Sequence, residues 1–144
     1  MTKKLLNPGS YDQQINIALL FLRITIGIFM MVHGTGKLIT LFEGGPVQFA
    51  DPIGIGPSAS LMLAVFAEFV CSLFLIFGIA TRFAVVPLII TMLVAGFIVH
   101  ADDVFFVKEK AFMFLFVFIT IAIAGAGKIS VDNLIYKRLP LDDK

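Results

Sequence analysis

Six polar side chains interrupt the long apolar stretches of this sequence, at positions where they could do chemistry. Acids, imidazoles and amines are the groups that transfer protons and hydrogen-bond to polar ligands. An ionisable group in the middle of a bilayer costs about 2.5–3.5 kcal/mol on insertion scales, so each such group needs a partner or a function. The six residues are Arg23, His33, Lys37, Glu68, His100 and Glu109.

Arg23 and Glu68 lie deepest within their apolar stretches. At the helical rise, Arg23 would lie about 12 Å and Glu68 about 18 Å from the same membrane surface. An arginine side chain can bridge that difference, so we predict that the two residues contact each other. Three interpretations stay open: a structural ion pair between two helices, a protonatable Glu68 that faces a ligand cavity, and an unpaired, neutral Glu68.

The other four polar residues are predicted to gather at the opposite membrane surface. On a helical wheel, His33 and Lys37 share one stripe with Met30. His100 ends the third apolar stretch and Glu109 precedes the fourth on the same side, so the four groups form a candidate cluster. Two alternatives are histidines with only an interfacial role and axial ligation of a haem iron. Haem is the less favoured cofactor, because both histidines lie near the membrane surface.

The composition indicates which elements position these residues. Hydrophobic residues make up 59% of the 144 residues, charged residues 15%, and the mean hydropathy is +1.01, well above that of soluble domains. A bilayer core needs about 20 helical residues, and four stretches are long enough. We therefore predict an all-α membrane protein, a single domain over residues 1–144 in which four transmembrane helices form an antiparallel bundle. The predicted spans are Ile15–Gly34, Ser60–Ala80, Phe83–His100 and Ala111–Gly127.

Shorter segments connect and follow the spans. A Gly/Pro-rich loop that includes residues 44–46 joins the first two, a tight turn at Gly78–Arg82 joins the next two, and the polar segment Ala101–Lys110 precedes the last. The tail Lys128–Leu141 alternates apolar and polar residues behind Ser130, a favourable N-cap. We predict that it forms a short amphipathic helix on the membrane surface.

The distribution of basic residues predicts the orientation. Lysines and arginines accumulate on the side of both termini, which the positive-inside rule places in the cytoplasm. The residues on that side are Lys3, Lys4, Arg82, Lys128, Lys137, Arg138 and Lys144, against Lys37, Lys108 and Lys110 on the other. A net charge of +1 without a long basic run excludes nucleic acid as a partner. The one cysteine, Cys71, cannot form an intrachain disulfide and is expected in the core.

Several short motifs resemble, in order and spacing, those of the DoxX family of small bacterial membrane proteins. The resemblance extends over most of the chain, from Leu19 to Leu134. It rests on Leu22, Arg23, His33, Gly34, Lys37, Glu68, Gly78–Arg82, His100, Glu109, Gly125–Gly127 and Ser130–Asp132. It implies a four-helix oxidoreductase or oxidoreductase subunit of the bacterial inner (cytoplasmic) membrane, without a settled reaction. Relatives include small subunits of thiosulfate:quinone oxidoreductases.

Together these observations favour a membrane oxidoreductase subunit that interacts with quinone or a redox partner. A quinol loses protons with its electrons, so its site needs hydrogen-bonding groups beside an apolar slot. The predicted catalytic residues are His33, Lys37, Glu68, His100 and Glu109, and the predicted cofactor-binding residues are Arg23, Met30, Phe97, Met113 and Phe116. No dinucleotide or metal motif is present, so other protein subunits are expected to hold any further redox group. The alternative is a non-catalytic accessory subunit of a larger complex in the lipid bilayer.

Overall fold

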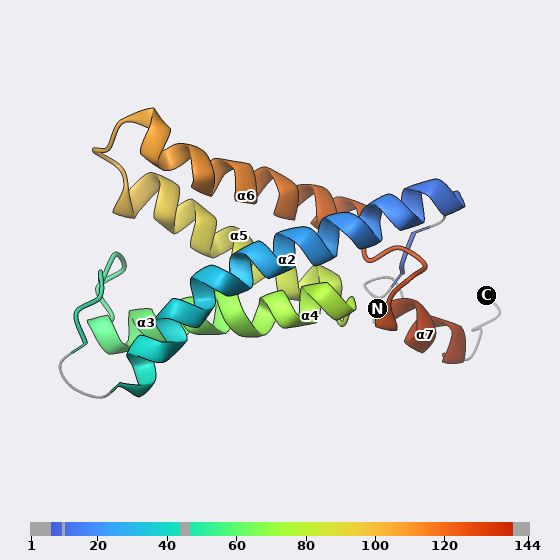
Figure 1. Cartoon of the computed structure of the whole chain (residues 1–144), viewed down its shortest axis with the longest axis horizontal. Helices are drawn as coiled ribbons and strands as arrows, with labels where there is room; N and C mark the ends of the chain where they lie inside the picture. The colour runs from blue at the N-terminus through green and yellow to red at the C-terminus, as the bar shows by residue number, and fades with distance from the viewer. Residues whose placement is uncertain (1–6, 10, 44–46, 140–144) are drawn as a thin grey trace.

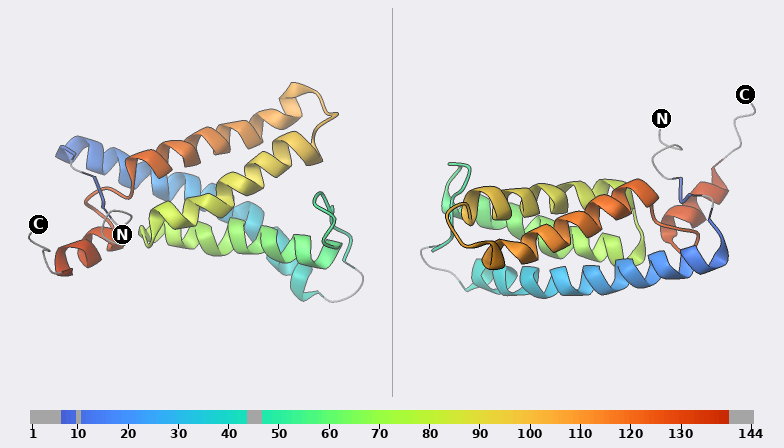
Figure 2. Two further views of the ribbon diagram at one scale, coloured as in Figure 1. Left: turned by 180° about the vertical axis from the view of Figure 1, so that it is seen from behind. Right: turned by 90° about the horizontal axis from the view of Figure 1, so that it is seen from above.

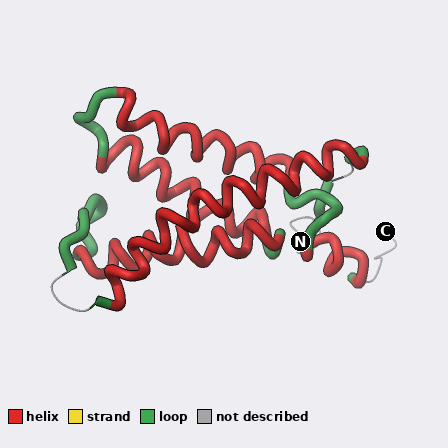
Figure 3. The backbone as a smooth tube through the Cα atoms, in the orientation of Figure 1, coloured by secondary structure: helices red, strands yellow, loops and turns green. Residues whose placement is uncertain are grey.

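The computed structural model of the chain describes residues 7–9, 11–43 and 47–139. Most of these residues are helical, and no strand occurs among them (Figure 3). The prediction of an all-α fold is therefore confirmed for the described part of the chain. Three helical stretches are long and apolar enough to cross a membrane, and they cover Gln13–Phe42, Pro57–Phe77 and Thr81–Val99.

The helices follow one another along the chain with two short π-helical segments among them. Their bounds are α2 Gln13–Phe42, α3 Pro57–Val65, η1 Phe66–Cys71, α4 Ser72–Phe77, α5 Thr81–Val94, η2 Ala95–Val99, α6 Phe105–Ala124 and α7 Val131–Arg138 (Figure 1). The second apolar stretch thus consists of α3, η1 and α4, and the third of α5 and η2. A π-helical turn is rare, and it occurs frequently at functional sites.

The helices do not coincide with the predicted spans. The first helix starts before Ile15 and continues past Gly34 to Phe42, because Lys37 faces the protein instead of ending the helix at the surface. The second and third helices each begin and end before their predicted limits. The fourth begins at Phe105, so the second half of the predicted polar segment is helical. Three of the 20 residues of α6 are charged, and for this reason α6 is not among the three helices classed as candidate spans by their composition.

Helix packing divides the long helices into two groups. One group consists of α2 lying along α3, η1 and α4, and the other of α5 lying along α6 (Figure 1; Figure 2). Contacts of α5 with η1 and α4, and of α2 with α6, join the groups. The shared core includes Met30, Cys71, Leu88 and Phe118, which confirms the expected burial of Cys71. The outward faces carry many exposed large apolar side chains, as expected for helices in a lipid bilayer.

The last helix, α7, is docked on the turn between α4 and α5. Ser130 is its N-cap, as predicted, and its Oγ accepts a hydrogen bond from Asn133 N at 3.2 Å. The buried Asp132 carboxylate accepts hydrogen bonds from the backbone N–H groups of Ala80, at 2.6 Å, and Thr81, at 2.9 Å. Asp132 thereby caps the start of α5. The tail helix is shorter than predicted and is anchored to the protein by these contacts.

Some predicted features lie outside the described residues. They are the basic residues Lys3, Lys4 and Lys144, the loop residues Gly44, Gly45 and Pro46, and the end of the predicted tail at Leu141. The orientation in the membrane, which depends partly on these basic residues, stays a prediction.

Candidate functional site

Gly34 allows α2 to approach η1 closely. A Cβ atom on Gly34 would lie 2.6 Å from the carbonyl carbon of Glu68 and 2.7 Å from the backbone nitrogen of Phe69. Small residues permit such close backbone contact where helices pack in membranes. Lys37 follows Gly34 by about one helical turn and starts on the same face of α2. The close approach therefore brings Lys37 next to Glu68.

Glu68 and Lys37 form a partly buried ion pair. Glu68 is 3% exposed, and its Oε1 accepts a hydrogen bond from Lys37 Nζ. Glu68 Oε2 is buried and has no hydrogen-bond partner among the described residues. Lys37 Nζ also lies 5.8 Å from the centre of the Phe49 ring, within range of a cation–π interaction. One carboxylate oxygen thus retains the capacity to accept a further hydrogen bond.

The predicted contact between Arg23 and Glu68 is wrong. Glu68 lies level with Gly34, and Arg23 precedes Gly34 on α2 by about three turns, or about 16 Å. The fully buried Arg23 lies instead beside Gly78, where a Cβ would come within 1.9 Å of Arg23 Nη1, and its Nη2 donates to Ile129 O at 2.8 Å. Depths counted from the end of each span placed the two residues together, but the ends of the two helices are not level.

A pocket of about 320 Å³, here named pocket A, lies beside the ion pair. Its lining is mostly apolar and comes from α2, the loop after it, α3, η1, α5 and η2. Leu63 on α3 and Ile90 on α5 line it and are 53% and 55% exposed, so the pocket reaches the apolar outer surface between these helices. The lining residues are Lys37, Phe49, Ala50, Pro52, Ile53, Ser60, Leu63, Ala64, Glu68, Ile90, Thr91, Val94, Ala95, Val99 and His100.

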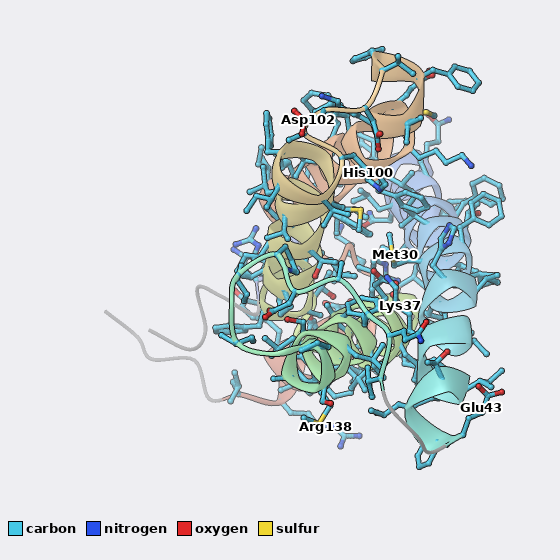
Figure 4. All side chains as sticks on the ribbon, turned by 90° about the vertical axis from the view of Figure 1, so that its left-hand side faces the viewer. Met30, Lys37, Glu43, His100, Asp102 and Arg138 are labelled. Carbon is cyan, nitrogen blue, oxygen red and sulfur yellow. The ribbon has the colours of Figure 1, made fainter. Side chains whose placement is uncertain are left out.

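A second pocket of about 230 Å³, here named pocket B, adjoins pocket A. It shares Lys37, Glu68, Ala95 and His100 with pocket A. Figure 4 looks at this end of the molecule and shows Met30, Lys37 and His100 in the space between the helices, with Glu43 outside it. The lining residues are Met30, His33, Lys37, Glu68, Met92, Ala95, His100, Val107, Lys110, Ala111 and Phe114.

His100 has a carboxylate partner that the sequence analysis missed. Its Nδ1 lies 2.7 Å from Asp103 Oδ2, an interaction that favours a proton on Nδ1 and makes Nε2 the acceptor when the ring is neutral. The spacing of three residues between His100 and Asp103 was an available signal. Lys110, which lines pocket B, was also missed. Its neighbour Glu109 was chosen instead, and only the rotation of α6 decides which of the two faces the pocket.

The structure brings half of the predicted site residues to the two pockets. These are Met30, His33, Lys37, Glu68 and His100. Glu109 is exposed on α6 and lines neither pocket. The aromatic and thioether residues Phe97, Met113 and Phe116 are 61%, 63% and 65% exposed and also line neither. Across the described ranges, no group of three or more His, Cys, Asp or Glu side chains is placed to hold a metal ion.

Comparison with known proteins identifies the family. The profile of the DoxX family matches residues 18–101, which extend from α2 to the residue after His100. This segment contains His33, Lys37, Glu68 and His100, whereas Glu109 and the Ser130–Asp132 motif lie beyond it. Neither a search of curated proteins nor a search of solved structures returned a match. Because the matched segment covers more than half of the 144 residues, this chain belongs to the DoxX family.

Proposed function

We propose that this protein is a subunit of a bacterial inner-membrane oxidoreductase, and that pocket A binds the head group of a quinone or quinol. The observation that carries the proposal is the Glu68 carboxylate, which is 3% exposed and pairs only one oxygen with Lys37. A buried polar atom without a hydrogen bond is costly, and a ligand hydroxyl at Oε2 would remove that cost.

The residues around pocket A suit both redox states of such a ligand. A quinol would donate one hydroxyl to Glu68 Oε2, whereas a quinone, which only accepts, would be held by the Lys37 ammonium. Oxidation of the quinol would release two electrons to a redox group in a partner subunit. The two protons would pass to the bases that line the pocket, Glu68 and His100. The volume of about 320 Å³ lies at the lower end of the range of small-molecule sites.

The surroundings of pocket A support a ligand that arrives from the membrane. Leu63 and Ile90 expose apolar surface where the pocket reaches the outside, so an apolar tail could stay in lipid. We further propose that α6 is the fourth membrane span of an antiparallel bundle with both termini in the cytoplasm. Its packing along α5 and its exposed Met113, Phe116 and Ile123 support this assignment.

The test is the affinity of the purified protein, held in lipid nanodiscs, for a short-chain ubiquinol analogue. Glu68→Gln should weaken binding about 5- to 30-fold, because a lost hydrogen bond costs about 1–2 kcal/mol. Glu109→Gln is the matched control, since it makes the same change outside both pockets, and its affinity should equal that of the wild type. Absence of binding by the wild type, or equal affinities of the two variants, would favour the non-catalytic accessory subunit.

A further inference from the structure

Pocket A and pocket B meet at Glu68, but their linings differ in chemistry. We propose that pocket B is a separate aqueous branch of the site, through which Glu68 exchanges protons with the surface while pocket A holds the ligand. The identity of the ligand rests on the proposed function. The aqueous branch itself depends only on the shape and chemistry of pocket B.

The rim of pocket B is polar where that of pocket A is apolar. Two lining residues that pocket A lacks, His33 and Lys110, are exposed, and Val107 beside them is 43% exposed. Water enters a cavity when several polar groups are present to bond it. His33, Lys110 and His100 supply such groups in the lining of pocket B. The corresponding part of pocket A is bordered by Leu63 and Ile90, which bond no water.

The charged and titratable groups around Glu68 make it the proton carrier of this branch. Lys37 pairs with it, and pocket B beside it is lined by Lys37 and His33 from α2, His100 from the end of η2 and Lys110 from α6. Glu68 is the one carboxylate among the residues found to line either pocket. A proton that leaves it therefore meets water or an imidazole, and the Asp103 carboxylate, which lies 2.7 Å from His100 Nδ1, is outside both linings.

The proposed step transfers a proton without moving electrons. The O–H bond of a quinol in pocket A breaks while an O–H bond forms at Glu68 Oε2. The proton then passes to water in pocket B or to the His33 ring, and the carboxylate is restored. The second proton of the quinol passes to His100, which also lines pocket A. The two electrons leave separately to the redox group of the partner subunit, so charge and atoms balance.

A water-soluble carbodiimide tests the route to Glu68 directly. The reagent condenses a carboxylate with an adjacent amine, so it should join Glu68 to Lys37 with loss of one water, which mass spectrometry detects. Val107→Trp narrows pocket B and Ile90→Trp narrows pocket A, and both positions are exposed enough to accept a larger side chain. If Val107→Trp does not fold, Lys110→Trp is the alternative variant that narrows pocket B.

Two opposite patterns are expected from the obstructed variants. Val107→Trp should slow the cross-linking of Glu68 to Lys37 several-fold, and its affinity for the ubiquinol analogue should equal that of the wild type. Ile90→Trp should weaken binding and leave cross-linking at the wild-type rate. The reverse pattern, equal cross-linking rates in all variants, or no cross-link in the wild type would overturn the aqueous branch. Absent ligand binding with the expected cross-linking pattern would refute the proposed function alone.

Discussion

Replacing Gly34 by alanine should push α2 away from η1 and weaken the Lys37–Glu68 pair. A Cβ at this position would meet three backbone atoms of Glu68 and Phe69 at 2.6–2.8 Å. Backbone atoms cannot rotate aside, and ordinary contact begins at 3.4 Å, so the helices must separate by about 0.8 Å. The Lys37–Glu68 ion pair lies one helical turn away, so the distance between Lys37 Nζ and Glu68 Oε1 should increase as the helices separate.

Gly36 on the same helix is the matched control, because a Cβ there meets nothing within 4 Å. Alanine stabilises a helix interior by about 0.5–1 kcal/mol relative to glycine. Gly36→Ala should show that gain alone. At Gly34 the same gain is opposed by an overpacking cost of about 1–3 kcal/mol. Gly34→Ala should therefore be less stable than Gly36→Ala by about 1–3 kcal/mol.

The assay is reversible unfolding in mixed micelles, followed by circular dichroism as the denaturing detergent is increased. Carbodiimide cross-linking of Lys37 to Glu68 gives an independent measure of helix separation, and its rate should fall in Gly34→Ala only. If the two alanine variants unfold alike and cross-link alike, then the close approach at Gly34 does not position the ion pair, and the geometric argument is refuted.

Three further outcomes are expected. Lys37→Met and Glu68→Gln should each lower the unfolding midpoint more than the double variant does, because a single change strands a polar partner in an apolar surrounding; additive losses would contradict the pair. Asp132→Ala should cost about 1–2 kcal/mol of unfolding free energy, since α5 loses its cap, and an unchanged melting curve would exclude that role. Hydrogen bonds from the backbone N–H of Gly56 and the Ser60 hydroxyl hold the pKa of Asp51 below its ordinary value. The contribution of the Asp51 carboxylate to the stability of the folded protein is therefore complete above its unfolded pKa of about 4, and it is lost as the pH falls through its folded pKa. Asp51→Asn should be less stable than the wild type at pH 7 by thermal melting, with the difference closing in acid.

The candidate cluster could be predicted in part because helical periodicity is a local property. His33 and Lys37 are one turn apart and share a face with Met30 in any α-helix, and the structure places all three at pocket B. Glu109 was assigned from its place at the start of a span and Phe97 from its apolar character, and neither lines the two pockets. Their helices were expected, but their rotation about the helix axis is set by packing against α5 and α6, which the sequence pattern does not reveal.

The sequence by itself determined the helical class, the apolar stretches and the family. Hydropathy is a property of neighbouring residues, and the order of the motifs is read directly along the chain. Ser130 as the N-cap of α7 and Cys71 in the core belong to the same group. Only the tertiary structure decided that Lys37 is the partner of Glu68 and that Arg23 lies at the other end of the protein. The physical reason is the close crossing at Gly34, which sets how far α2 is displaced along η1 and α4, and this displacement depends on contacts between residues far apart in the chain.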